Sequence, residues 1–151
     1  MGLLDVVFPP KCAACGRPGW PLCERCADGV AVVVPPLCSR CGSPTEEPLR
    51  SCVECPPREI DTVRSPFVYE GPIAGAIRGM KFSGWRALGA HLAAAMAEVA
   101  GEARADVVTW VPLSRRRRAR RGFDQAEVLA RGVASAVGLP ARRLLTRRRN
   151  T

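Results

Sequence analysis

The sequence predicts an α/β chain that begins with a small cysteine-rich module, and three observations lead to this prediction. Eight cysteines lie between Cys12 and Cys55, arranged as four Cys-x-x-Cys pairs. An apolar, β-branched run at 106–111 is typical of a buried strand in a parallel sheet. Apolar residues recur at helical spacing on either side of this run, at 86–103 and at 124–138. Strands that alternate with helices in this way indicate an α/β domain.

The cysteine array has the spacing of two metal sites. Two residues between cysteines suit a tight turn that aims both sulfurs at one ion, and a tetrahedral Zn²⁺ needs four thiolates. The segment 12–18 is echoed by the segment 38–44, and each has a glycine directly after its second cysteine, where a positive φ is useful. We therefore expect two structural zinc ions with sequential ligand sets, which are Cys12, Cys15, Cys23 and Cys26, followed by Cys38, Cys41, Cys52 and Cys55.

Other arrangements of the eight cysteines stay open at this point. In crossed pairing, the 12/15 pair would share an ion with the 38/41 pair, but the sequential repeat favours sequential sites. Four disulfides would suit a small secreted domain, but no signal peptide precedes the array, so we expect a reducing, cytoplasmic location. A redox role for one pair would need a thioredoxin-like βαβ context, which the sequence lacks.

The remainder of the chain is expected to form a second domain. The Pro56-Pro57 pair closes the cysteine module, which gives a zinc-binding module at 1–57 and an α/β domain at 62–151. The elements expected in the second domain are an extended stretch at 62–70, helices at 73–82, 86–103 and 124–138 with Gly138 as the C-cap, a strand at 106–111, an arginine-rich loop after that strand, and a further strand near 143–145.

The charge of the chain is concentrated near its C-terminal end. The net charge is +9, with +10 in residues 115–151 and −1 in residues 1–114. Such a segment predicts an anionic partner, which could be phosphate, pyrophosphate or nucleic acid, although an arginine run such as Arg115–Arg118 is more often a solvated face. No stretch is long enough to span a membrane. The single histidine, His91, is expected on a helix surface.

Two short segments give a resemblance to a known family. After a zinc array of this kind, the segments Trp110-Val-Pro-Leu-Ser114 and Arg121-Gly-Phe-Asp-Gln125 resemble the ComF family. The likeness extends to Tyr69, to Met80-Lys81-Phe82 and to Leu145-Thr-Arg147, so it covers nearly the whole chain. Asp124 stands where the family usually has asparagine.

The resemblance implies an N-terminal double zinc ribbon joined to a type I phosphoribosyltransferase-like domain. It links the chain to natural competence and DNA uptake, with single-stranded DNA, competence-machinery proteins and phosphoribosyl pyrophosphate or pyrophosphate as partners. Mg²⁺ would join the zinc ions only in a complete transferase site. The matching positions implied in phosphate or pyrophosphate binding are Ser114, Arg115, Arg121, Gly122, Phe123 and Gln125.

One motif of the family has no counterpart in this sequence. The family's strand, two acidic residues and Thr/Gly-rich loop hold the 5′-phosphate, whereas the only adjacent acidic pair here is Glu46-Glu47, between cysteine pairs. We therefore expect an incomplete, C-terminally truncated family member that is inactive as a transferase, with its catalytic residues unassigned. The alternatives are a non-catalytic zinc-ribbon adaptor for single-stranded nucleic acid or a protein partner, and a fragment that folds only at its ribbons.

Overall fold

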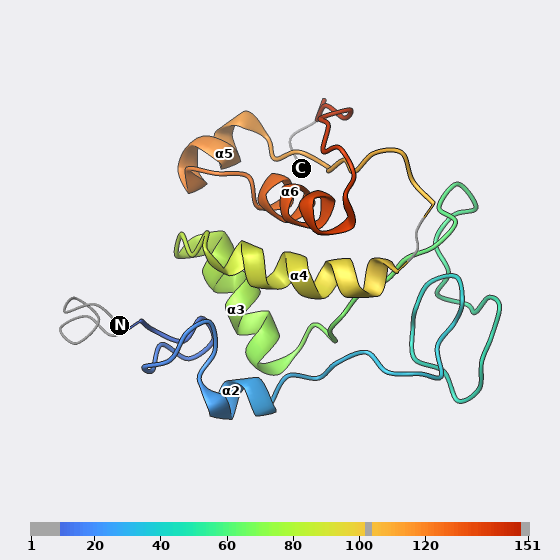
Figure 1. Cartoon of the computed structure of the whole chain (residues 1–151), viewed down its shortest axis with the longest axis horizontal. Helices are drawn as coiled ribbons and strands as arrows, with labels where there is room; N and C mark the ends of the chain where they lie inside the picture. Colours follow the sequence, from blue (N-terminus) through green and yellow to red (C-terminus); the bar gives the residue numbers. More distant parts are fainter. Residues whose placement is uncertain (1–9, 102–103, 149–151) are drawn as a thin grey trace.

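Helices make up most of the regular structure. The computed structural model describes residues 10–101 and 104–148, and Figure 1 shows its order of elements. The helices are α2 (Glu24–Asp28), α3 (Gly71–Phe82), α4 (Leu88–Ala100), α5 (Arg115–Arg121) and α6 (Gln125–Val137). Within the described ranges, β-structure is limited to isolated bridges. The fold is mostly helical with little strand, so the predicted α/β domain is not confirmed.

The three longer helices lie where the apolar spacing predicts them. Pro72 stands in the first turn of α3, where its missing N–H costs nothing. The carboxylate of Asp124 caps α6 by accepting from the backbone N–H groups of Ala126 and Glu127. Gly138 ends α6 in the left-handed region at φ 71°, as expected of a C-cap. The helix α4 is shorter than predicted at both ends.

The arginine-rich segment forms a helix, so the prediction of a loop there is wrong. The Oγ of Ser114 accepts a hydrogen bond from the N–H of Arg117 (3.4 Å) and begins α5. Gly122 adopts φ 77° and donates its N–H to the carbonyl of Arg118 (2.8 Å), which ends the helix. Arginine is a good helix former, so a run of arginines between these two caps favours helix over loop.

The predicted strand at 106–111 is reduced to one parallel bridge between Val108 and Ala141. The N–H of Val108 donates to Pro140, and the carbonyl of Val108 accepts from Arg142, both at 2.9 Å. The residue that pairs with Val108 is thus Ala141, which lies slightly before the second strand predicted near 143–145. Trp110 is buried, but Val111 is 67% exposed, so only part of the 106–111 segment is buried.

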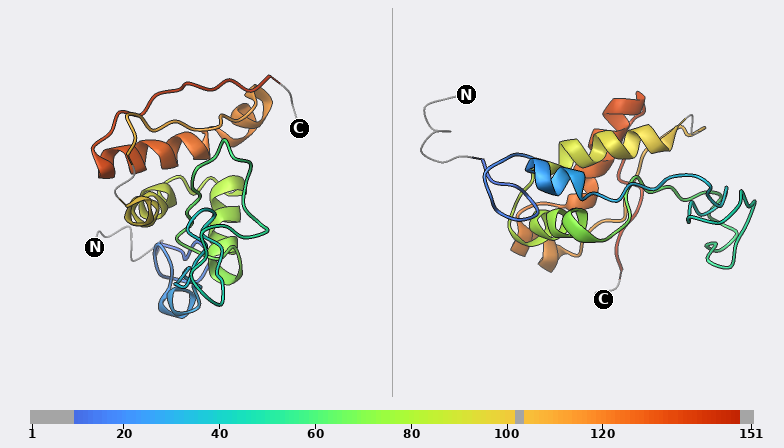
Figure 2. Two further views of the ribbon diagram at one scale, coloured as in Figure 1. Left: turned by 90° about the vertical axis from the view of Figure 1, so that its right-hand side faces the viewer. Right: turned by 90° about the horizontal axis from the view of Figure 1, so that it is seen from below.

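The first cysteine segment and the helices share one hydrophobic core. Its buried members come from the first cysteine turn, from α3 and from α4, and they are Ala13, Ile73, Ala76, Met80, Leu88 and Leu92. Phe123, Val128 and Leu129 pack against this cluster from the side of α6. The helices α4 and α6 lie side by side in Figures 1 and 2. Gly132 of α6 permits this close approach, because a Cβ there would lie 2.5 Å from the Cβ of Ala93 in α4.

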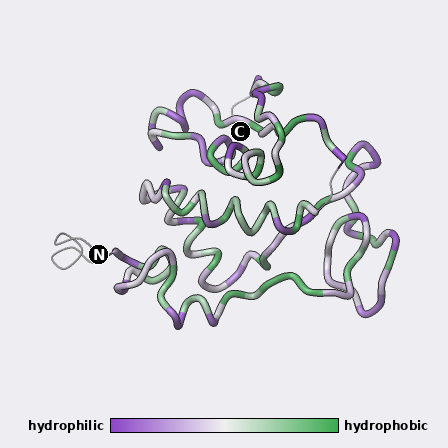
Figure 3. The backbone as a smooth tube through the Cα atoms, viewed as in Figure 1, coloured by the Kyte–Doolittle hydropathy of each residue, from purple (hydrophilic) through white to green (hydrophobic). Residues whose placement is uncertain are grey.

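The second cysteine segment stands apart from the helices in both figures. The chain that leads into it and the chain that leaves it pair in antiparallel fashion, with Val32 opposite Phe67. Val33 donates to Pro66 (3.1 Å) and Val68 donates to Ala31 (2.9 Å). Figure 3 shows that the α5 region and the outer turns of this segment are hydrophilic, which agrees with their exposure.

Candidate functional site

The two cysteine segments begin with the same turn. In the first, the N–H of Gly16 donates to the carbonyl of Cys12, and in the second the N–H of Gly42 donates to Cys38, both at 2.9 Å. Both glycines have positive φ, at 76° and 73°, which confirms the reason for glycine at these positions. The sequence repeat is therefore also a structural repeat.

The second pair of each set completes a four-sulfur cluster. Cys23 precedes α2 and Cys26 lies within it, so a short helix presents both thiols of that pair. In the second cluster the turn between Cys52 and Cys55 closes with a backbone hydrogen bond of 3.3 Å. The ligand atoms of each cluster lie within 4.8 Å of one another, and the members are Cys12, Cys15, Cys23 and Cys26, and Cys38, Cys41, Cys52 and Cys55. Sequential pairing is thus confirmed.

The sulfur positions fit Zn²⁺. Zn–S bonds of about 2.3 Å in a tetrahedron place sulfurs about 3.8 Å apart. The Sγ atoms of Cys15 and Cys23 are 3.7 Å apart, and those of Cys38 and Cys55 are 3.6 Å apart. All eight cysteines are free, so none of them forms a disulfide in the described residues. Four thiolates without an open position make a structural zinc site that holds the chain rather than a catalytic one.

Hydrogen bonds prepare several thiols of the clusters for ionisation. Burial opposes ionisation of Cys12, but backbone N–H groups, that of Cys23 foremost, lower its pKa to about 6. The hydroxyl of Ser43 lowers the pKa of Cys41. The hydroxyl of Ser51 does the same for the pKa of Cys55, with Oγ and Sγ 3.3 Å apart. Such donors favour the thiolate form, which is the form that binds zinc.

One thiol in each cluster resists ionisation when no cation is present. Burial, followed by contacts with the neighbouring thiols, raises the pKa of Cys26 to about 12. The contact with Cys41 is the main cause that raises the pKa of Cys52 to about 12. Four thiolates at this separation repel one another, so a bound cation is needed to ionise the whole set at neutral pH.

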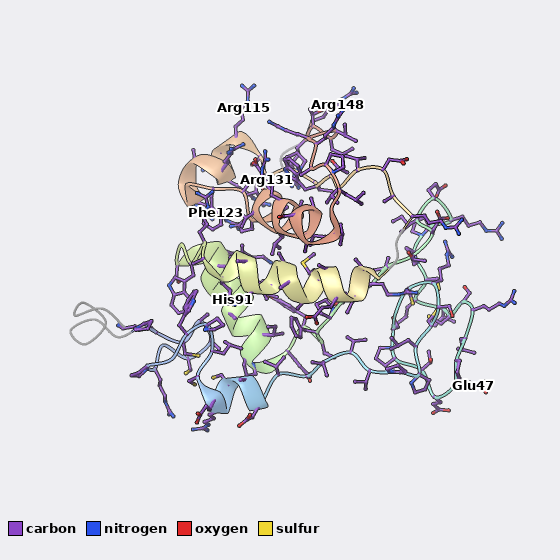
Figure 4. All side chains as sticks on the ribbon, in the orientation of Figure 1. Glu47, His91, Arg115, Phe123, Arg131 and Arg148 are labelled. Carbon is purple, nitrogen blue, oxygen red and sulfur yellow. The ribbon has the colours of Figure 1, made fainter. Side chains whose placement is uncertain are left out.

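The residues predicted to bind phosphate or pyrophosphate lie around α5. Ser114 is the N-cap of α5, and Arg115 is exposed at its first position; Figure 4 shows Arg115 pointing away from the rest of the molecule. Arg121, Gly122 and Phe123 lie at the other end, where Phe123 packs against the core. Arg121 and Gln125 are in direct contact, whereas Ser114 and Arg115 lie at the opposite end of α5.

Asp124 ties the two ends of this segment together. One carboxylate oxygen accepts the N–H of Leu113 (2.7 Å), and the other accepts the N–H groups that begin α6. Asp124 is only 3% exposed, so these bonds replace the water that its carboxylate loses. The side chain of Asp124 therefore holds together the two points where the chain enters and leaves α5.

Arg121 and Gln125 form a polar contact with unused donors. Arg121 Nη1 donates to Gln125 Oε1 at 3.0 Å, and the guanidinium lies over the ring of Phe82, 5.1 Å from its centroid. Arg121 Nε and Gln125 Nε2 are buried, and neither has a hydrogen-bond partner among the described residues. Leaving such groups unsatisfied costs about 1–3 kcal/mol each.

Lys81 of α3 was not predicted as a site residue, and its ammonium lies over the ring of Tyr69, 6.0 Å from the centroid. It lines a hollow with Phe82, Gly84, Arg120 and Arg121, with a volume of about 550 Å³. Lys81 stands directly beside Phe82 in a segment that the ComF resemblance includes. That segment was the available signal, but no side chain partner of Lys81 could be inferred from the sequence. His91 is exposed on α4, with its ring 6.2 Å from that of Trp20.

Comparisons with known proteins agree with the metal centres. A family model described as a double zinc ribbon domain matches residues 3–56. No match was found among curated proteins, and none among solved structures. Across the described residues, no helix has the length and apolar character needed to cross a membrane. The N-terminal part of the chain is a double zinc ribbon whose two tetracysteine clusters fit two structural zinc ions.

Proposed function

We propose that this chain is a ComF-like protein that binds the phosphate groups of single-stranded DNA through its α5 surface. The double zinc ribbon supports the likeness, together with the segments Trp110–Ser114 and Arg121–Gln125 in the same chain. The proposed role is in the handling of DNA during natural competence, in the cytoplasm, alongside other proteins of the competence machinery.

The observation that carries the proposal is the charge of α5. The helix consists of six arginines and one alanine, and Arg115–Arg118 and Arg120 are exposed. Glu127 pairs with Arg118 (3.6 Å), but it also pairs with Arg131 at 3.0 Å. One carboxylate therefore offsets only a small part of this charge. Guanidinium groups donate in pairs to phosphate oxygens, so the surface suits a polyphosphate strand.

Phosphoribosyl transfer lies outside the proposal for these 151 residues. Transfer needs the leaving pyrophosphate and the 5′-phosphate to be held together, so that the reacting carbon faces the acceptor. The region of Arg121 and Lys81 offers cations for one of these groups. The sequence has no acidic pair followed by a Thr/Gly-rich loop for the other, so we propose binding of phosphates without transfer, as in an adaptor.

The experiment is a titration of the zinc-loaded chain with a labelled oligothymidylate, followed by fluorescence anisotropy at several salt concentrations. Log affinity should fall against log salt with a slope of about −0.7 for each phosphate contacted. Changing Arg115–Arg118 together to alanine should flatten this slope, and alanine preserves the helix. The matched control removes four exposed arginines in the zinc ribbons or directly after them, Arg17, Arg25, Arg50 and Arg58, and should keep the slope. If both variants flatten the slope equally, net charge alone explains the binding and the proposal is refuted.

A further inference from the structure

Two aromatic side chains lie exposed around the end of α3. Phe82, the last residue of that helix, is 66% exposed, and Tyr69, which precedes the helix, is 59% exposed. The other phenylalanine, tyrosine and tryptophan side chains of residues 10–101 and 104–148 are buried or half-buried. Because the burial of an aromatic ring is strongly favourable, these two rings offer unused apolar surface to a ligand.

A cation lies over each of the two rings. The guanidinium of Arg121 is 5.1 Å from the centroid of Phe82, and the ammonium of Lys81 is 6.0 Å from the centroid of Tyr69. Both distances are within the range of cation–π attraction. Arg121 is itself held by the hydrogen bond that it donates to Gln125 Oε1. Each ring thus has a cationic neighbour, yet a large part of its side chain stays accessible.

The hollow at the end of α3 places Phe82 next to further positive charge. Its lining consists of Lys81, Phe82, Gly84, Arg120 and Arg121, with no acidic side chain. Arg120 is exposed and has no carboxylate partner among the described residues. Since Lys81 and Arg121 already lie over rings, Arg120 is the cation of this hollow whose charge is left for a phosphate.

Arg120 also belongs to the α5 surface, which we propose binds the phosphates of single-stranded DNA. A strand that follows α5 to its last residues therefore reaches the hollow beside Phe82. Each nucleotide of that strand carries an unpaired base close to its phosphate. Proteins that bind single strands commonly combine a positively charged surface with aromatic side chains on which such bases stack. The exposed rings and the arginines of α5 supply both parts.

We propose that Phe82 and Tyr69 form a stacking platform for the bases of single-stranded DNA, with Arg120 bound to an adjacent phosphate. The proposal rests on the α5 function and adds recognition of the base. Arginines alone attract any polyanion, including a duplex, whereas stacking on a side chain needs a base that is unpaired. Because every base has a π-face, the platform accepts all four bases.

The test compares oligothymidylate with an abasic oligomer of the same length, by fluorescence anisotropy with the zinc-loaded full chain. Both oligomers carry the same phosphates, so the ratio of their affinities isolates the contribution of the bases. Oligothymidylate should bind about tenfold more tightly than the abasic oligomer. Phe82→Leu and Tyr69→Leu keep an apolar side chain but lose the ring. Each should lower this ratio, and the double variant should bring it close to one.

Conservative variants separate stacking from the positioning of Arg121. Phe82→Tyr and Tyr69→Phe keep an aromatic ring and should keep the ratio. The affinity for the abasic oligomer should be the same in all variants. If Phe82→Leu weakens both oligomers equally, Phe82 only positions Arg121 and the platform is refuted. Far-UV circular dichroism checks that each variant is folded.

Photo-cross-linking tests the platform in the unchanged chain. An oligothymidylate that contains 5-iodouracil forms a covalent bond to a stacked aromatic ring on irradiation, and tandem mass spectrometry locates the bond. The cross-link should map to Phe82 or Tyr69. Cross-links confined to other residues would overturn the proposal.

The same measurements distinguish the platform from the α5 surface. If the abasic oligomer binds as tightly as oligothymidylate, while alanine at Arg115–Arg118 flattens the salt slope, the platform is refuted and the α5 proposal stands. If alanine at Arg115–Arg118 leaves the slope unchanged, while the ratio stays at about tenfold, the α5 proposal fails and the platform is supported.

Discussion

The carboxylate of Asp124 joins the backbone of Leu113 to the first turn of α6. Its Oδ2 accepts the N–H of Leu113 at 2.7 Å, and its Oδ1 accepts the N–H of Ala126 at 3.1 Å. The hydrogen bonds described for this buried side chain are all donated by backbone N–H groups. The position therefore requires two acceptor oxygens, which an aspartate has and an asparagine does not.

We predict that Asp124→Asn destabilises the protein by about 1–3 kcal/mol, because the amide NH₂ must face either Leu113 or the helix N–H groups. Urea unfolding followed by circular dichroism measures the change. Asp106→Asn is the control, since Asp106 is exposed and loses the same charge. Equal stability of the two variants would show that charge, rather than the hydrogen bonds to Asp124, sets the effect.

Loss of the first zinc cluster should destabilise the helices more than loss of the second. Ala13 of the first cluster's turn is buried in the shared core, and a Cβ added at Gly79 of α3 would lie 3.2 Å from its carbonyl oxygen. The first ribbon therefore packs directly on α3. The second ribbon stands apart and is tied to the helices mainly through the paired connecting chains.

We predict that Cys15→Ser and Cys41→Ser each leave about one zinc per chain, but that only Cys15→Ser lowers the melting temperature of the helices strongly. Structural zinc supplies about 10–16 kcal/mol of apparent binding energy in small zinc domains, comparable with the whole stability of a domain at about 5–15 kcal/mol. Native mass spectrometry counts the zinc, and circular dichroism at the helix signal gives the melting. Similar melting curves for the two variants would contradict the asymmetry.

Zinc affinity should fall as the pH is lowered. Cys26 and Cys52, whose pKa values are raised to about 12, hold protons at neutral pH until zinc displaces them. Acidification adds competing protons at Cys12, whose pKa is about 6. Because zinc binds thiolates, each added proton opposes binding, and the loss grows between about pH 8 and pH 5.

Competition with a chelator at several pH values measures this dependence, after correction for the chelator's own protonation. Titration calorimetry in two buffers of different ionisation enthalpy counts the protons that zinc releases. Cys41→Ser restricts the measurement to the first cluster. An affinity that is independent of pH would mean that the thiols are already ionised without metal.

Local sequence spacing was sufficient to predict the zinc sites and the main helices. Two residues between paired cysteines, followed by a glycine, favour a tight turn that aims both sulfurs at one ion. The positive φ of Gly16 and Gly42 confirms this turn. The apolar spacing of α3 and α6 likewise reflects which face meets the core. These features depend on neighbours in the chain, so the sequence carries them directly.

Other features depend on partners that are distant in the sequence. The loop prediction for 115–121 failed because the charge of the run was weighed more than its helix propensity and its caps, Ser114 and Gly122. The unsatisfied amide of Gln125 arises from its contact with Arg121 and its burial against α3 and α4. No pattern along the chain encodes that combination.

The close packing of α4 on α6 gives a final prediction. A Cβ built on Gly132 of α6 would lie 2.5 Å from the Cβ of Ala93, far inside contact distance. A glycine in mid-helix normally costs about 1 kcal/mol relative to alanine, so Gly→Ala usually stabilises a helix. Here we predict the opposite, a loss of about 1–3 kcal/mol for Gly132→Ala, because neither Cβ can rotate away.

The double variant Ala93→Gly with Gly132→Ala moves the missing methyl group from one helix to the other. It should recover most of the lost stability, although Ala93→Gly alone should also destabilise by about 1 kcal/mol. A double-mutant cycle from urea unfolding should therefore give a coupling energy of about 0.5–3 kcal/mol that favours the double variant. Simple additivity of the two single changes would mean that α4 and α6 do not meet at this pair. Recovery would establish that the absence of a side chain at Gly132 sets the distance between α4 and α6.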